Sequence, residues 1–270
     1  MRVQIPPPAL KMKFFLLLLL GTHLKFVSLA PSVTEIIYYL GIDSVLVGNT
    51  IYCDFPKEAK KKVHVGDLIN PNIETIKKLN PDYVITVSPM QDQLKIKLKK
   101  AGLKVISCQQ NSFDDIAECI RKIGELAGNK TGYIRFVKKL QSLDTLSRLD
   151  KKILFVLSEK PMYAAGKNTF INEIIEKAGA TNAATFDGYK MISPEIIRSI
   201  NPDIIIITGE KASAKDFSGK IGIKNTKASK HHCIFTVDAD LFTRPGPRVI
   251  QATLHLRKIL ESCTKDGKNQ

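Results

Sequence analysis

The chain has 270 residues, of which 44% are hydrophobic, and its 41 Lys and Arg against 26 Asp and Glu give a formal net charge of +15. This composition fits a globular chain, and the length allows two lobes that each bury a core. The excess Lys residues are scattered, and clusters such as Lys60 to Lys62 are typical of solvated faces. We therefore expect no nucleic-acid partner, since such a partner needs positive charge gathered on one face.

The N-terminus has the residue order of a secretory signal. Two Lys residues precede the apolar run Phe14 to Leu20. Seven apolar residues cannot span a bilayer, which takes about 20, and Thr22 stands where a lipidated Cys would follow Leu-Leu-Gly. We expect residues 1–22 to lie outside the fold as a signal-like or misassigned segment, with Met12 as an alternative start. This segment is either cleaved or kept as a membrane anchor.

The next part of the chain alternates between strand and helix patterns. The expected strands are residues 25–30, 45–48, 83–88 and 104–108, and the expected helices are residues 32–40, 72–79 and 91–101. Gly41 and Gly102 stop two of these helices, and Asn80-Pro81 stops the third. Alternation of this kind predicts a parallel sheet that is covered on both faces by helices.

The central stretch from Ser112 to Leu149 is helical in pattern. Ser112 with Asp115 predicts a capping box, and an apolar stripe then continues until Gly128. A second stripe predicts one continuous helix from Lys130 to Leu149, roughly 30 Å long at 1.5 Å per residue. We expect this helix to be a stiff tether and the principal covalent connection between two lobes.

The alternation resumes after the tether. The expected strands are residues 152–158, 203–208 and 233–237, and the expected helices are residues 169–177, 194–200 and 247–263. The fold class is therefore α/β, with two Rossmann-like lobes built on parallel sheets. The predicted division is an N-terminal lobe at 23–128, the linking helix at 129–149, a C-terminal lobe at 150–263 and a tail at 264–270.

Two internal matches relate the halves of the chain. Glu74 lies seven residues before Pro81, and Glu195 lies seven residues before Pro202, with an apolar strand pattern following in both cases. A second match pairs Thr34-Glu35-Ile36-Ile37 with Asn172-Glu173-Ile174-Ile175. Any short helix before an Asn-Pro stop and a buried strand would look similar, but two matches in the same order favour duplication.

Motifs of familiar enzymes are absent from the sequence. It contains no G-x-G-x-x-G after the first strand, no phosphate loop and no G-x-S-x-G. The five Cys residues have no zinc-ligand spacing, so we expect most of them to be small buried hydrophobes, and their odd number disfavours a full disulfide framework. We predict no catalytic residue, no metal site and no resident cofactor. A cleft between two lobes without recognisable catalytic motifs favours a ligand-binding protein over an enzyme.

Several short segments occur in a characteristic order across both lobes. They are Phe26 to Ser32 with Thr34 and Glu35, Tyr52 to Pro56, Asn72 to Glu74 with Asn80 to Asp82, Gly166 to Phe170, and Arg244 to Arg248. On these segments the chain resembles the periplasmic-type substrate-binding proteins of ABC importers, in the helical-backbone group that serves cobalamin, haem and ferric siderophores. The Tyr-Cys-Asp-Phe-Pro segment is most similar to the cobalamin-binding branch.

The resemblance implies a function and a site. It implies capture of a cobalt- or iron-chelate, first of all a cobalamin-like corrinoid, in a cleft between the lobes. The implied ligand-binding residues are Tyr52, Tyr189, Asp240 and Arg244, with Phe170 and Met90 as neighbours. Tyr189 stands where the cobalamin binder carries a cleft tryptophan, and Asp240 stands where it carries an aspartate.

The resemblance also implies partners. Glu74 and Glu195 match the family's docking glutamates for a membrane permease, which works with its ATPase. The protein would be a monomer in the periplasm or elsewhere outside the cytoplasm. Haem or a ferric siderophore is the alternative ligand, with Tyr52 as the axial ligand for haem. An enzyme of another class, a chelatase on a related two-lobed frame, would need a His with a carboxylate facing the cleft.

Overall fold

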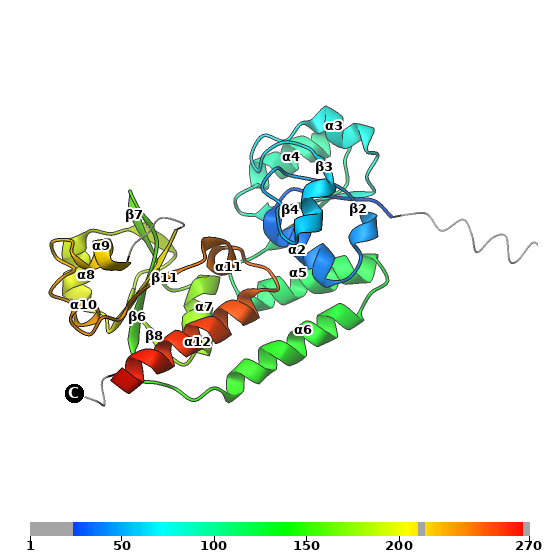
Figure 1. Cartoon of the computed structure of the whole chain (residues 1–270). Coiled ribbons are helices and arrows are strands. Elements are labelled where there is room, and N and C mark those ends of the chain that lie inside the picture. Colours follow the sequence, from blue (N-terminus) through cyan, green and yellow to red (C-terminus); the bar gives the residue numbers. More distant parts are fainter. Residues whose placement is uncertain (1–23, 210–213, 267–270) are drawn as a thin grey trace, which may run out of the picture.

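The structure is a computed structural model that describes residues 24–209 and 214–266. It contains two sheets, each packed with its own helices, which we call the N-terminal lobe (β1 to β5) and the C-terminal lobe (β6 to β11) (Figure 1). The predicted signal-like segment at residues 1–22 lies outside the described residues.

The N-terminal lobe has the predicted parallel sheet, in the strand order β3-β2-β1-β4-β5. Its strands are β1 (Phe26–Ser28), β2 (Leu46–Asn49), β3 (Val63–His64), β4 (Tyr83–Ser88) and β5 (Val105–Gln109). Its helices are α2 (Pro31–Tyr39), α3 (Ile73–Lys78), α4 (Asp92–Lys100) and α5 (Phe113–Leu126), with 3-10 turns at Asp43–Val45 and Lys57–Lys61. Helix α2 begins with Pro31, whose missing N–H is not needed there. It ends before Gly41, whose φ of +69° suits glycine.

The C-terminal lobe has a mixed sheet in the order β11-β10-β6-β7-β9, with β8 paired to the same β6. Its strands are β6 (Lys152–Glu159), β7 (Met162–Ala165), β8 (Thr181–Asn182), β9 (Tyr189–Met191), β10 (Ile204–Thr208) and β11 (Ile234–Val237). Its helices are α7 (Phe170–Lys177), α8 (Pro194–Ile200), α9 (Ala214–Ser218), α10 (Lys227–Lys230), α11 (Ala239–Thr243) and α12 (Val249–Asp266). The predicted central parallel sheet is confirmed, because β8, β6, β10 and β11 are parallel, and β7 runs antiparallel to both β6 and β9 at one edge.

The connection between the lobes differs from the prediction. Helix α6 (Thr131–Ser142) has 12 residues, or about 18 Å, and is followed by a 3-10 turn at Leu143–Thr145. A continuous helix to Leu149 is therefore wrong. Leu146 is already extended, and the Leu149 N–H donates to the Gly179 carbonyl at 2.7 Å, so contacts with the second lobe replace further helical turns. In Figure 1, α6 lies beside α12 below both lobes.

One hydrophobic core runs through both lobes. Alternate residues of β6 and β10, such as Phe155 and Ile206, join Phe26 and Ile85 of the first sheet in a single cluster of buried side chains. The residues between them, such as Leu154 and Ile205, point to a separate cluster on the outer face of the C-terminal lobe. Because the strands bury both faces, they appear in the sequence as continuous apolar runs.

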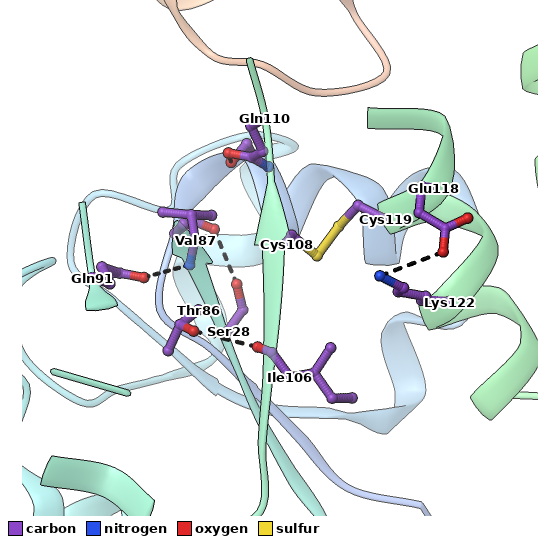
Figure 2. The surroundings of a disulfide bond; sticks show 12 residues. Ser28, Thr86, Val87, Gln91, Ile106, Cys108, Gln110, Glu118, Cys119 and Lys122 are labelled. Atoms are coloured by element: carbon purple, nitrogen blue, oxygen red, sulfur yellow. Dashed lines mark hydrogen bonds and ion pairs between the residues drawn. A yellow bond between two sulfur atoms is a disulfide. The ribbon is translucent and has the colours of Figure 1, made fainter. Parts of the chain in front are cut away.

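Four of the five cysteines form disulfides, so the expectation that most are merely small buried hydrophobes is wrong. Cys108 of β5 is joined to Cys119 of α5 (Figure 2). Cys233 is joined to Cys263 of α12, and Cys53 is free and buried. The pairing could not be read from the spacing, because the partners lie 11 and 30 residues apart and meet only through the packing of helix on sheet.

The internal repeat corresponds to the same local structure in both lobes. Asn80 and Asn201 each adopt a left-handed conformation, with φ of +46° and +48°. Asp82 then accepts a hydrogen bond from the Lys25 N–H at 2.8 Å, and Asp203 accepts one from the Lys152 N–H at 2.9 Å. In each lobe this aspartate ties the entry of one central strand to its parallel neighbour, which supports duplication.

Candidate functional site

A cleft of about 720 Å³ lies between the two lobes. Its N-terminal wall is formed by segments that follow parallel strands: Pro31 after β1, Tyr52 after β2, Met90 after β4 and Gln110 after β5. Parallel sheets bind ligands at this carboxyl edge. Tyr163, Phe170, Tyr189 and Arg244 contribute to the opposite wall from the C-terminal lobe. The structure thus brings five of the six predicted ligand-binding residues to one cleft, and Asp240 contacts Arg244 beside it.

A second hollow of about 850 Å³ lies between α6 and α12. It is larger, but it is lined by side chains from helices, among them Tyr39, Lys139, Leu254 and Lys258. It does not lie at the carboxyl ends of the strands. The cleft between the lobes is therefore the candidate ligand site.

Three tyrosines and a methionine give the cleft its apolar surface. Tyr52, Tyr163 and Tyr189 are between 37% and 49% exposed, and Met90 is 55% exposed. Exposed rings of this size on facing lobes can lie flat against a large ring system while their hydroxyls bond to its edge. Phe170 is only 5% exposed, so it supports the cleft from the core and offers little contact surface.

Tyr163 was missed by sequence reasoning. It lies on β7, a four-residue strand that pairs with β6 and with β9, which carries Tyr189. In the register of β7 with β9, Tyr163 faces Met191, and Tyr189 faces Ala165. Strands this short carry too little alternation to be recognised in a sequence.

Tyr189 has a sheltered hydroxyl group. Desolvation by burial raises its pKa to about 12, although a hydrogen bond with Thr169 acts in the opposite direction. The ring remains partly exposed to the cleft. The residue is therefore suited to stacking and to neutral hydrogen bonding rather than to acting as a phenolate.

Arg244 lines the cleft, but carboxylates surround its guanidinium group. Its Nη1 lies 2.6 Å from Asp54 Oδ1 and 3.6 Å from Glu35 Oε1, and its Nη2 lies 2.8 Å from Asp240 Oδ1. Burial acts against the charged form, but the hydrogen bond with Asp54 and the charges of all three carboxylates prevail and raise the pKa of Arg244. Arg244 is therefore a paired cation, not a free donor for an anionic ligand.

Glu35 and Arg248 continue this network between the two lobes. Glu35 is almost fully buried on α2 and accepts bonds from Arg248 Nε at 2.8 Å and Nη2 at 2.6 Å. Arg248 also stacks on Phe55, with its Cζ 4.0 Å from the ring centroid. Glu35, Asp54 and Phe55 come from the N-terminal lobe and the two arginines from the C-terminal lobe, so the network joins the lobes.

The proposed docking residues lie outside the cleft. Glu74 is in the first turn of α3 and Glu195 in the first turn of α8, one in each lobe, and both are exposed. Asn72 and Ser193 cap these helices. Hydrogen bonding by the Ser193 hydroxyl lowers the pKa of Glu195, which therefore carries its charge at neutral pH.

In the two described ranges, no group of three or more His, Cys, Asp and Glu side chains is arranged to hold a metal ion. No helix within these ranges combines the length and apolar character that crossing a membrane requires.

Comparisons with known proteins agree with this architecture. Residues 26–241 match the family model described as periplasmic binding protein. The chain is 37% identical to the uncharacterised ABC transporter substrate-binding lipoprotein YvrC of Bacillus subtilis, over 86% of this chain and 78% of that protein. It is 27% identical to the vitamin B12-binding protein of Vibrio cholerae, over 84% of this chain and 86% of that protein.

A solved structure is also similar. A possible iron-binding, periplasmic solute-binding protein of Staphylococcus epidermidis superposes with a TM-score of 0.75 at 31% identity, covering 87% of this chain and 98% of that one. The fold and cleft define a two-lobed substrate-binding protein. The chain belongs to the periplasmic binding protein family. It is the substrate-binding component of an ABC transporter, which acts outside the cytoplasm with a permease and its ATPase, and it is not an enzyme.

Proposed function

We propose that the protein captures a cobalamin-like corrinoid in the cleft between its lobes. The observation that carries this proposal is the charge of the cleft wall. Among the described residues that line the cleft, Arg244 is the only charged one, and it is already paired with Asp54 and Asp240. The network of Glu35, Asp54 and Asp240 with Arg244 and Arg248 has three carboxylates against two guanidinium groups. It offers no surplus positive charge to an anionic ligand.

This charge balance distinguishes the candidate ligands. Haem carries two propionates, and many ferric siderophores are anionic, so burying either in this cleft would leave negative charge without a counter-ion. The corrin ring of cobalamin carries neutral carboxamides, which bond to tyrosine hydroxyls and to carboxylates such as Asp240. The exposed tyrosine rings supply flat contact surface for a ring of that size. The Vibrio cholerae relative is a vitamin B12-binding protein, which supports the same ligand class.

Haem is the second candidate, because a cleft tyrosine can act as an axial ligand to iron. Tyr52 and Tyr163 are exposed enough to do so. The raised pKa of Tyr189 disfavours that residue in the role, since the coordinating form is the phenolate.

The test is isothermal titration of the purified protein with cyanocobalamin, haemin and a ferric hydroxamate siderophore. We expect cyanocobalamin to bind most tightly. Tyr52→Ala and Tyr189→Ala should each weaken its binding, by about 1–3 kcal/mol for a lost stacked ring. Tyr133→Ala is the control, because Tyr133 lies on α6 away from the cleft. Tight binding of haemin or the siderophore without binding of cyanocobalamin would overturn the proposal.

Glu74 and Glu195 are proposed as the contacts with the permease. One exposed carboxylate on each lobe can meet one basic surface on each transmembrane subunit, and charges at the rim of an interface chiefly set orientation and association rate. The order of the two internal repeats supports this proposal, because it gives both residues the same place in their lobes.

A further inference from the structure

Gln110 has a side chain that the protein itself uses only in part. It follows β5 directly, lines the cleft and is 8% exposed. Its Oε1 accepts a hydrogen bond from Ser32 Oγ at 2.9 Å. Its Nε2 is buried and has no hydrogen-bond partner. Figure 2 shows Gln110 at the end of β5, beyond the Cys108–Cys119 disulfide.

A second buried glutamine in the same lobe shows the usual arrangement. Gln91 donates from Nε2 to the carbonyls of Leu29 and Leu68, at 2.8 and 2.6 Å, and accepts from the Val87 N–H at 2.8 Å. Its amide is fully used to hold the lobe together. A buried donor without an acceptor destabilises the folded protein, so an unused amide calls for an explanation.

The position of Gln110 provides the explanation. The described residues contain three buried polar side-chain atoms without a partner, which are Asp92 Oδ1, Ser107 Oγ and Gln110 Nε2. Of these three residues only Gln110 lines the cleft.

The neighbouring helix fixes which end of the amide is left unpaired. Ser32 is in the first turn of α2, which has no acidic residue there and no side-chain cap. The N-terminus of a helix carries partial positive charge, so it favours the amide oxygen on its own side. This places Oε1 toward Ser32 and leaves the Nε2 donor for another acceptor.

We propose that Gln110 is a specificity-determining residue, whose Nε2 donates a hydrogen bond to a carboxamide or carboxylate oxygen at the rim of the bound chelate. The terminal torsion of glutamine is soft, so a small rotation turns Nε2 toward the cleft surface that the residue already lines. The ligand thus satisfies a donor that no group of the described residues pairs. This inference rests on the proposed function, because it requires a chelate in the cleft.

Two variants test the hydrogen bond. Gln110→Met keeps the length of the side chain and removes both the Nε2 donor and the Oε1 acceptor of Ser32. Gln110→Glu keeps the shape and the acceptor for Ser32 but replaces the donor with an oxygen. Gln109→Met is the matched control, because Gln109 is the preceding residue, is exposed and does not line the cleft. Each variant is titrated with cyanocobalamin and cobinamide, which carry carboxamide oxygens, and with haemin, which carries carboxylate oxygens. The thermal midpoint of each variant is also measured.

We expect both Gln110 variants to bind the chelate about tenfold more weakly than wild type does. A loss of this size corresponds to one missing hydrogen bond. We expect no change in affinity for Gln109→Met. The thermal midpoint of Gln110→Met should stay close to that of wild type, because the variant loses an unpaired donor together with the acceptor of the Ser32 hydroxyl. This inference would be overturned if Gln110→Met bound the chelate as tightly as wild type, or if Gln110→Met lost affinity and Gln110→Glu did not. Either result would leave the proposed function standing. A wild type that binds none of the three probes would overturn both.

Discussion

Glu35 of α2 and Arg248, just before α12, join the two lobes through two hydrogen bonds of 2.8 and 2.6 Å. This planar pairing has a fixed geometry, and it joins the two lobes at a point where the chain itself does not connect them. Arg244 adds a second contact between the lobes at 2.6 Å from Asp54. The width of the cleft therefore depends on these ion pairs and on the shared core, in addition to α6.

The first prediction concerns the stability of this contact. Arg248→Ala should lower the free energy of unfolding by roughly 3–5 kcal/mol, because it leaves the buried carboxylate of Glu35 without its principal partner. Chemical denaturation measures the change. Arg198→Ala is the control, since Arg198 lies on the exposed face of α8. If Arg248→Ala lowered the free energy of unfolding no more than Arg198→Ala, the pair of Glu35 and Arg248 would not stabilise the contact between the lobes.

The second prediction concerns pH. Burial of Glu35 outweighs the lowering by Arg248 and Arg244, so the pKa of its carboxyl is raised in the folded protein. Between the unfolded pKa, near the ordinary glutamate value of about 4.3, and the higher folded pKa, the folded state binds more protons than the unfolded state. The contribution of Glu35 to stability therefore falls as the pH rises through this window.

Glu35→Gln removes this titration. The free energy of unfolding of the variant, compared with that of wild type, should therefore improve as the pH rises through the same window. Denaturation at a series of pH values measures this difference. A difference that is independent of pH, or that moves in favour of wild type, would contradict the raised pKa.

The third prediction concerns the disulfide between Cys233 and Cys263, which fastens α12 to the start of β11. Replacing both cysteines by serine should lower the free energy of unfolding by about 2–4 kcal/mol, because a 30-residue loop is no longer closed in the unfolded chain. Cys53→Ser is the control, because it replaces a cysteine that forms no disulfide. Equal midpoints for wild type with and without reductant would show that this bond does not stabilise the protein.

The fourth prediction separates docking from binding. Glu74→Lys with Glu195→Lys should abolish uptake through the permease and leave the affinity for the ligand unchanged, because both residues lie away from the cleft. Uptake into vesicles and titration of the free protein measure the two effects. Glu176→Lys on α7 is a control that reverses an exposed carboxylate outside both docking positions. Normal uptake by the double variant would rule out the docking role.

Much of this structure could be predicted because strong local signals determine it. The strand from Tyr83 to Ser88 and the helix from Pro194 to Ile200 have the bounds that the apolar run and the Ser-Pro start predict. The end of α6 could not be predicted, because contacts between Leu149 and the second lobe outweigh the helical stripe.

The candidate site was predictable only in part. Several of its residues follow strands, so their position at the cleft could be expected. Their ion pairs could not, because the partners come from the other lobe. Arg244 appeared to be a free ligand donor until the structure placed Asp54, 190 residues earlier in the chain, beside it. The unpaired amide of Gln110 leaves no signal in the sequence, since Gln91 looks the same there and is fully bonded.

The most direct test of the proposed ligand class is the absorption spectrum and intact mass of the protein purified with its cargo from its own host. The corrinoid proposal predicts the visible bands of a corrin and a mass increase of one cobalt corrinoid, both lost in Tyr52→Ala with Tyr189→Ala. A haem Soret band, or the charge-transfer band of a ferric chelate, would contradict it.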